Sequence, residues 1–240
     1  MSNYKIIVAL VLLFILFGIF LYFGRSIYIP IFNKFRKKET VDTILKKIER
    51  DVLTRLEKEL AIAGYKMDYP HKIIIAAFKE EKELNVYSDD YNGIKFIKKY
   101  SFTGYSGTLG PKLKEGDKQI PEGIYKIEHL NPNSAFYLSL KVNYPNDFDK
   151  SKSSPENINQ MGGDVFIHGK SSTVGCIPIG DKAIEELFVL AHKAFNYEIK
   201  VIISPKDFRN NPEFPNIKNI DWEKELYSLI AEELNRLPKN

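Results

Sequence analysis

The stretch VFIHGKSSTVGCIPIG, from Val165 to Gly180, contains the only cysteine of the chain, Cys176, a short distance after His168. A thiol becomes a strong nucleophile when an imidazole accepts its proton or stabilises the thiolate. The apolar residues before His168 predict a short buried strand, and Gly175 lets the backbone approach a substrate closely. We therefore expect Cys176 to be a nucleophile with His168 as its base. The backbone amides of Gly175 and Cys176 are candidates for binding an oxyanion.

An unreactive, buried Cys176 is the alternative interpretation, because free cysteines are among the most buried residue types. Other site chemistries find less support. The chain has one cysteine and contains neither a CxxC nor an HExxH motif, so we expect no metal site. It also lacks a dinucleotide fingerprint and a P-loop, so we expect no cofactor.

The stretch around Cys176 resembles the active-site signature of the L,D-transpeptidase (YkuD-type) catalytic domain, in which His-Gly precedes Ser/Thr-x-Gly-Cys. The matching residues here are Ile167–Gly169 and Thr173–Cys176. The resemblance marks Gly169, Thr173 and Gly175 as oxyanion-binding or substrate-binding candidates, and it implies that the Gly169 carbonyl orients His168.

Two upstream blocks, Gly110–Tyr125 and Phe136–Asn146, are also similar to segments of that family, so the resemblance covers roughly residues 72–204. Two positions depart from the pattern: many members have His and Arg where this chain has Val174 and Pro178. These departures are similar to the YafK-like branch of the family, in which both cross-linking and hydrolysis are possible.

The resemblance implies covalent catalysis on peptidoglycan stem peptides. The Cys176 thiolate attacks the carbonyl of the L-centred diamino acid, a D-amino acid leaves, and an amine from another stem or from a protein lysine resolves the thioester. Such a reaction cross-links the wall or attaches a protein to it. If water replaces the amine, the enzyme is an L,D-carboxypeptidase or endopeptidase. A non-catalytic wall-binding module is the alternative from another functional class.

Residues 6–24 form an uncharged, apolar run close to the roughly 20 residues that span a bilayer as a helix. No A-x-A-like cleavage site follows the run, which favours an uncleaved single-pass anchor in contact with membrane lipid over a cleaved signal peptide. Arg25 and the basic residues at 34–38 follow the run, and the positive-inside rule alone would place the rest of the chain in the cytoplasm. A cell-wall substrate requires the opposite orientation. Because long domains translocate largely regardless of charge, we expect a domain that faces the periplasm or cell wall from a bacterial cytoplasmic membrane.

The net charge of +4 does not indicate a nucleic-acid partner, because the basic surplus lies beside the apolar run. All 31 acidic residues lie at or after Glu39, together with 29 of the 35 lysines and arginines. Contact with lipid headgroups explains the basic flank more simply than nucleic acid does.

The patterning predicts an α+β fold, mainly β, in which a β-sandwich or mixed sheet carries a helix after Cys176 and is flanked by amphipathic helices. Residues 146–163 are polar and predict a loop, either a lid over the site or an ordinary solvated loop. The segments we expect are an anchor with its basic flank at 1–38, an amphipathic helix and linker at 39–70, a catalytic domain at 71–204, and a linker with a C-terminal helix at 205–240.

Periodicity places the individual elements. The helix that ends before Gly64 is either a stalk that binds a partner or a helix packed on its own domain. Expected helices span 40–63, 181–195 and 221–237, and expected strands span 72–78, 84–87, 94–100, 123–130, 136–142, 164–168 and 198–203.

Overall fold

A computed structural model describes residues 10–14, 18, 38–66, 68–90, 93–218 and 220–239. The chain divides into two units, Met1–Lys38 and Glu39–Asn240. In the first unit, residues 10–14 are helical and their side chains are exposed. Most of the anchor expected at 6–24 lies outside the described residues. Of the helices that the structure does describe, none has the length and hydropathy that a bilayer crossing requires.

The second unit is built on one continuous mixed sheet with the strand order β3-β2-β1-β8-β4-β5-β6-β7. The sequence predicted either a β-sandwich or a mixed sheet, and the structure adopts the mixed sheet. The pairs β1 with β8 and β6 with β7 are parallel, and the other neighbours are antiparallel. The strands are β1 (Ile73–Phe78), β2 (Glu83–Asp90), β3 (Gly93–Ser101), β4 (Gly123–Ser134), β5 (Tyr137–Val142), β6 (Phe166–His168), β7 (Ile177–Pro178) and β8 (Lys200–Ser204).

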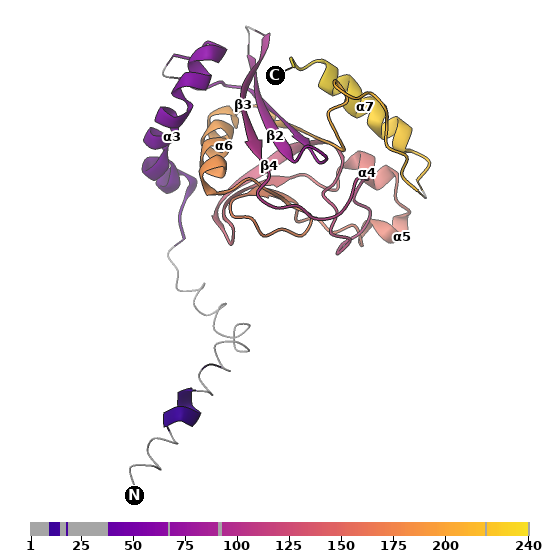
Figure 1. The fold of residues 1–240 in the computed structure, drawn as a ribbon, viewed down its shortest axis with the longest axis horizontal. Helices are drawn as coiled ribbons and strands as arrows, with labels where there is room; N and C mark the ends of the chain where they lie inside the picture. The colour runs from indigo at the N-terminus through magenta and orange to yellow at the C-terminus, as the bar shows by residue number, and fades with distance from the viewer. Residues whose placement is uncertain are drawn as a thin grey trace, which may run out of the picture. The chain divides into compact units, whose positions relative to one another are not determined.

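Helices cover both faces of the sheet (Figure 1). On one face α3 (Val41–Ala63) packs beside α6 (Asp181–Ala194), and the apolar side chains of both helices belong to one core. On the other face α7 (Glu223–Asn235) packs through Tyr227, Ile230 and Leu234 against the apolar residues of a second core. Strand β1, IIIAAF, is buried along its whole length because it lies between these two layers.

Local signals explain the bounds of α3. Thr40 and Thr43 form a capping box at its start, and Gly64 ends it in the left-handed conformation with φ 95°. The helix packs on its own domain, with Val52 and Leu56 fully buried. Arg55 on α3 also donates hydrogen bonds to two glutamates at the start of α6, Glu185 and Glu186.

Residues 146–163 contain two short helices, α4 (Asp147–Ser151) and α5 (Pro155–Ile158), where the sequence predicted a loop. Asn146 and Asp149 form a capping box at the start of α4, and they stabilise a helix too short to show apolar periodicity. Strand β7 was not predicted, because two residues carry no period. It exists through its pairing with β6.

A buried ion pair joins the loop before β4 to the sheet. The Lys79 Nζ and Glu122 Oε1 atoms are 2.8 Å apart, and both side chains are fully buried. Lys79 also donates to the carbonyls of Gly110 and Ile120, while Glu122 accepts from the Gly110 amide and from the Tyr227 hydroxyl of α7. Burial lowers the pKa of Lys79, and the charge of Glu122 opposes this shift.

Candidate active site

Parallel pairing of β6 with β7 places the bend that carries Cys176 beside the strand that ends at His168. Ile167 pairs with Ile177, and both side chains enter the core. His168 follows Ile167 and pairs with Pro178, whereas Cys176 lies in the bend just before Ile177, at the level of Phe166. The two residues are thus offset by two positions along neighbouring strands, and the His168 Nε2 atom makes no hydrogen bond with the thiol.

The His168 imidazole is fixed in one orientation by its surroundings. Its Nδ1 atom lies 2.6 Å from the Gly169 carbonyl oxygen, which can only accept, so Nδ1 carries the proton. The Phe136 ring covers the imidazole at a centroid distance of 4.5 Å. His168 is only 1% exposed, and its Nε2 atom has no hydrogen-bond partner among the described residues. The structure therefore presents a buried imidazole whose Nε2 lone pair is free to accept a proton.

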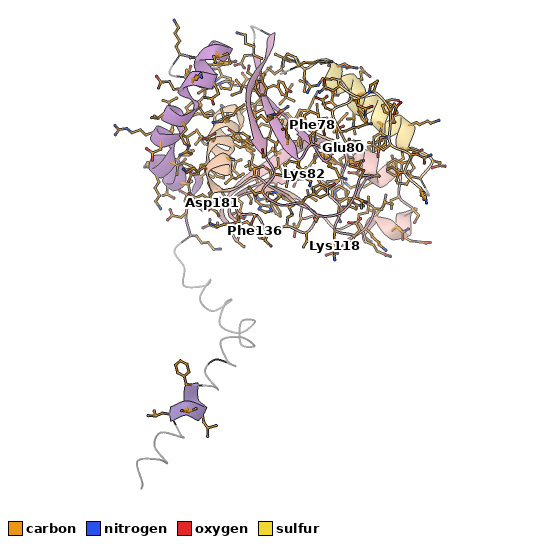
Figure 2. All side chains as sticks on the ribbon, in the orientation of Figure 1. Phe78, Glu80, Lys82, Lys118, Phe136 and Asp181 are labelled. Atoms are coloured by element: carbon orange, nitrogen blue, oxygen red, sulfur yellow. The ribbon has the colours of Figure 1, made fainter. Side chains whose placement is uncertain are left out.

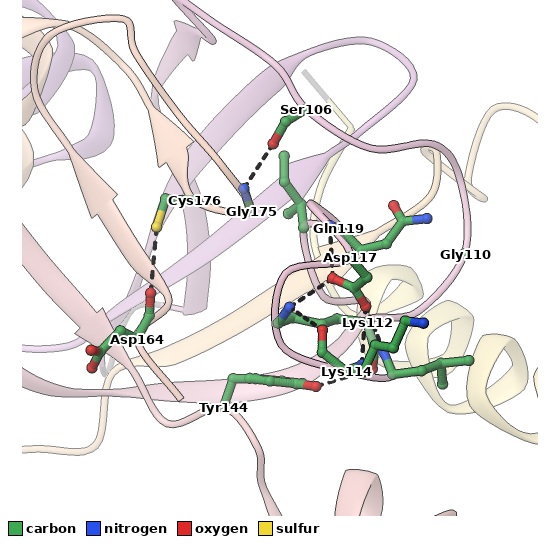
Figure 3. A network of polar contacts seen from close by, with 12 residues as sticks. Ser106, Gly110, Lys112, Lys114, Asp117, Gln119, Tyr144, Asp164, Gly175 and Cys176 are labelled. Carbon is green, nitrogen blue, oxygen red and sulfur yellow. Dashed lines mark hydrogen bonds and ion pairs between the residues drawn. The ribbon is translucent and has the colours of Figure 1, made fainter. Parts of the chain in front are cut away.

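Cys176 is half-buried, and its Sγ atom lies 3.5 Å from the backbone carbonyl oxygen of Asp164 (Figure 3). Burial raises the pKa of the thiol, and the charge of Asp164 adds to the increase. A backbone hydrogen bond from Phe166 and the charge of Lys112 act in the opposite direction. Burial also lowers the pKa of His168, although the Gly169 carbonyl partly offsets this shift. The two residues thus rest as a neutral thiol and a neutral imidazole at neutral pH.

The sequence suggested two backbone amides as oxyanion donors, and in the structure each of them already donates a hydrogen bond to a hydroxyl group. The Cys176 amide donates to Thr173 Oγ1 over 3.1 Å, and the Thr173 hydroxyl donates to the Cys176 carbonyl over 2.7 Å. The Gly175 amide donates to Ser106 Oγ over 2.7 Å (Figure 3). Thr173 therefore stabilises the turn that presents the thiol. An oxyanion at this turn must displace a hydroxyl from at least one amide.

At two positions beside the reactive residues, neighbouring atoms lie so close to the backbone that only glycine fits. Gly175 has φ +87°, and a Cβ atom there would lie 3.0 Å from the Gln119 carbonyl oxygen. A Cβ atom at Gly169 would lie 2.7 Å from both the Asp181 Oδ1 atom and the Phe136 carbonyl oxygen. Figure 2 shows Phe136 and Asp181 along the lower edge of the domain.

Several residues around the site were not identified from the sequence, because distant segments supply them. Ser106 contacts the Gly175 amide and lies in no motif, whereas Phe136 begins a block that the resemblance marked without assigning its contact with the His168 ring. Lys112 forms an ion pair of 2.7 Å with Asp117, which also accepts from the Leu113 and Lys114 amides (Figure 3). The resemblance had marked the block from Gly110 to Tyr125 as a unit, but it did not assign these contacts.

The described part of the chain contains no group of three or more His, Cys, Asp or Glu side chains that could hold a metal ion. The groups described above that can take part in chemistry are the thiol, the imidazole and the backbone amides. These groups suit the attack of sulfur on a carbonyl carbon.

Comparison with known proteins identifies the same region. Residues 72–203 match the model of the L,D-transpeptidase catalytic domain, YkuD, which is more than half of the chain. The chain is 31% identical over 118 residues to "Putative L,D-transpeptidase YafK" of Escherichia coli K12, a match that covers 48% of this chain and 46% of that protein. The chain thus spans about half the length of the curated relatives it matches.

Two solved structures are also similar. The helical cell shape determining protein Pgp2 from Campylobacter jejuni has a TM-score of 0.46 and 18% identity, over 75% of this chain and 77% of that one. Bd1075 from Bdellovibrio bacteriovorus has a TM-score of 0.41 and 20% identity, over 68% of this chain and 56% of that one.

Proposed function

The chain belongs to the L,D-transpeptidase family, and we propose from this premise that it is a cysteine acyltransferase acting on the stem peptides of peptidoglycan. One observation carries the mechanism. The Gly169 carbonyl holds the proton on Nδ1 of His168, and the buried Nε2 atom, without a hydrogen-bond partner among the described residues, is left to act as a base.

In the proposed first half-reaction, the thiol turns from the Asp164 carbonyl towards His168, and Nε2 accepts its proton as sulfur attacks the carbonyl of the L-centred diamino acid. A carbon–sulfur bond forms, and the carbonyl oxygen gains the negative charge. The amides of Gly175 and Cys176 stabilise this oxyanion once a hydroxyl has moved aside. The imidazolium then protonates the leaving amine, the D-amino acid departs, and a thioester remains on Cys176.

In the second half-reaction, an acceptor amine attacks the thioester and transfers its proton to His168, which restores the thiol. The neutral resting pair is consistent with this sequence, because proton transfer to Nε2 then accompanies the attack. An amine from a second stem gives a cross-link, and an amine from a protein lysine gives protein attachment.

Hydrolysis is the second candidate function, because water can replace the amine at the same thioester. Val174 and Pro178 support this candidate, because these departures from the family pattern are similar to the YafK-like branch, in which hydrolysis is possible. The two reactions differ only in which nucleophile the site admits. A non-catalytic wall-binding module is the weaker candidate, because it does not require a thiol and an imidazole of fixed tautomer in one motif.

The proposal includes a location. The apolar run at 6–24 would anchor the chain in the bacterial cytoplasmic membrane as a single pass, with the second unit facing the periplasm or cell wall, where peptidoglycan lies. A compartment-sensitive reporter fused after Asn240 tests this orientation. Activity of the reporter only in the cytoplasm contradicts it.

The activity test incubates the full chain with purified stem peptides, with and without an added acceptor amine, and identifies the products by mass spectrometry. A transpeptidase gives the amine adduct in its presence, whereas a hydrolase releases the D-amino acid and gives the shortened stem in both reactions. If neither product forms while the protein binds the peptides, the wall-binding module replaces the catalytic proposal.

A further inference from the structure

A hollow of about 280 Å³ lies between the loop around Lys112, the segment of α4 and α5, and Trp222. Ligand sites usually have volumes of about 300–1,000 Å³, so this hollow suits a fragment of a larger molecule. Trp222 lies beyond residues 72–203, which match the family model. One wall of the hollow therefore comes from a part of this chain outside the family domain.

More lysines than carboxylates line the hollow. Lys112, Lys114 and Lys152 line it, and Asp149 is the only carboxylate in its wall. Both oxygens of Asp149 already accept hydrogen bonds, from the Tyr125 hydroxyl and from the Asn146 amide. Lys112 and Lys152 each pair with a carboxylate, Asp117 and Glu225. The Lys114 ammonium is exposed and makes no ion pair or hydrogen bond with the residues that the structure describes.

A short stretch of chain connects the wall of the hollow to a residue that contacts the thiol. Met161 lines it, and the carbonyl of Asp164 contacts Cys176 Sγ. Three residues of extended chain span at most about 11 Å, which limits the separation of these two points. Lys112 connects the same two regions, because it lines the hollow and its charge lowers the pKa of the Cys176 thiol.

We propose that this hollow binds a free carboxylate of the donor stem peptide, with Lys114 as its cationic partner and the Trp222 indole as an apolar wall. This inference rests on the proposed function. A stem in which glutamate is linked through its γ-carboxyl group has a free α-carboxylate one residue before the diamino acid. Two residues of extended peptide cover about 7 Å, which lies within the limit of about 11 Å on the separation of Met161 and Asp164.

The test uses Trp222 as a reporter, because it is the only tryptophan of the chain. The full chain carrying Cys176→Ala is titrated with the tetrapeptide L-alanyl-γ-D-glutamyl-diamino acid-D-alanine, and tryptophan emission is recorded. The same titration uses a peptide whose glutamyl carboxylate is amidated. We expect a saturable change in emission with the acidic peptide and binding about fivefold weaker with the amidated one.

Lys114→Glu tests the cation. It is expected to weaken binding of the acidic peptide by about fivefold to tenfold and to leave binding of the amidated peptide nearly unchanged. Lys58→Glu is the matched control, because Lys58 is exposed on α3, outside the hollow, and the net charge changes equally. Equal losses in the two variants would overturn the proposal.

Calorimetry and mass spectrometry separate this inference from the function on which it rests. If the peptide binds by calorimetry and acylates the wild-type chain while Trp222 emission stays constant, the hollow is not the carboxylate site and the catalytic proposal stands. If the peptide neither binds nor reacts, both proposals fail.

Discussion

Two buried polar centres of this domain are organised in opposite ways. At the ion pair of Lys79 and Glu122, the ammonium has three acceptors and both carboxylate oxygens have donors. At His168 and Cys176, one imidazole nitrogen has no partner among the described residues, and the thiol donates to a backbone carbonyl over 3.5 Å.

The difference separates a centre that holds the fold from one that is available for chemistry. At Lys79 and Glu122, the ion pair and its hydrogen bonds offset the free-energy cost of burying two charges. The same hydrogen bonds join the end of β1, the loop before β4 and α7. A buried atom without a partner costs stability, which a protein tolerates where that atom is needed for function. We therefore expect substitutions at the first centre to change stability and substitutions at the second to change activity.

The largest effect is expected at the nucleophile. Cys176→Ala removes the atom that carries the acyl group, so turnover of stem peptides falls to the background rate. The hydrogen bond that the thiol donates to the Asp164 carbonyl is long and weak, and the melting temperature is expected to stay near that of the wild type. Product analysis together with a thermal melt checks both parts, and a folded variant that turns over normally would contradict the mechanism.

His168→Gln tests the base while keeping a polar side chain of similar reach. Loss of a general base typically costs about 100-fold to 10,000-fold, and we expect acylation to slow within this range. Single-turnover kinetics with a stem peptide measures the step directly. An acylation rate equal to that of the wild type would remove His168 from the reaction.

Glu122→Ala tests the satisfied centre. It leaves the Lys79 ammonium buried without its counter-ion, and breaking a buried pair costs about 3–5 kcal/mol of the free energy of unfolding. The control is Glu83→Ala, because the pair between Lys99 and Glu83 is partly exposed and contributes about 0–1 kcal/mol. Chemical denaturation of both variants gives the comparison, and similar losses would show that burial does not distinguish the two pairs.

The smallest effect concerns the pH dependence of stability at Asp149. Burial raises the pKa of its carboxyl from 3.8 to about 6, so the folded state favours the protonated form. This contribution to stability is present below pH of about 4 and is lost as the pH rises through about 6, by an amount on the order of 1–3 kcal/mol. Asp149→Asn is expected to flatten the stability curve across this window, as measured by denaturation at several pH values. An unchanged curve would assign the pH dependence to other groups.

Much of the fold could be predicted because its signals are local. The start of α3 at Thr40, its end at Gly64 and the period of two in β5 all depend on neighbouring residues. Strand β7 could not be predicted, because it consists of two residues that are ordered by β6. Helix α4 was missed although Asn146 and Asp149 supplied a capping signal.

The candidate site divides in the same way. His168 and Cys176 lie in one short motif, so the sequence alone was enough to propose both. Ser106 lies 69 residues before Gly175 in the chain, and only the fold brings its hydroxyl to that amide. The sequence also did not show that hydroxyl groups occupy the amides of Gly175 and Cys176, because such contacts depend on side-chain orientation.

The most direct test of the central claim, that the pair of His168 and Cys176 is the reactive centre, is the intact mass of the full chain after brief exposure to a stem tetrapeptide. The account predicts an adduct equal to the donor stem minus its D-amino acid, located on the peptide that contains Cys176 and absent from Cys176→Ala. Turnover without this adduct, or an adduct on another residue, would contradict it.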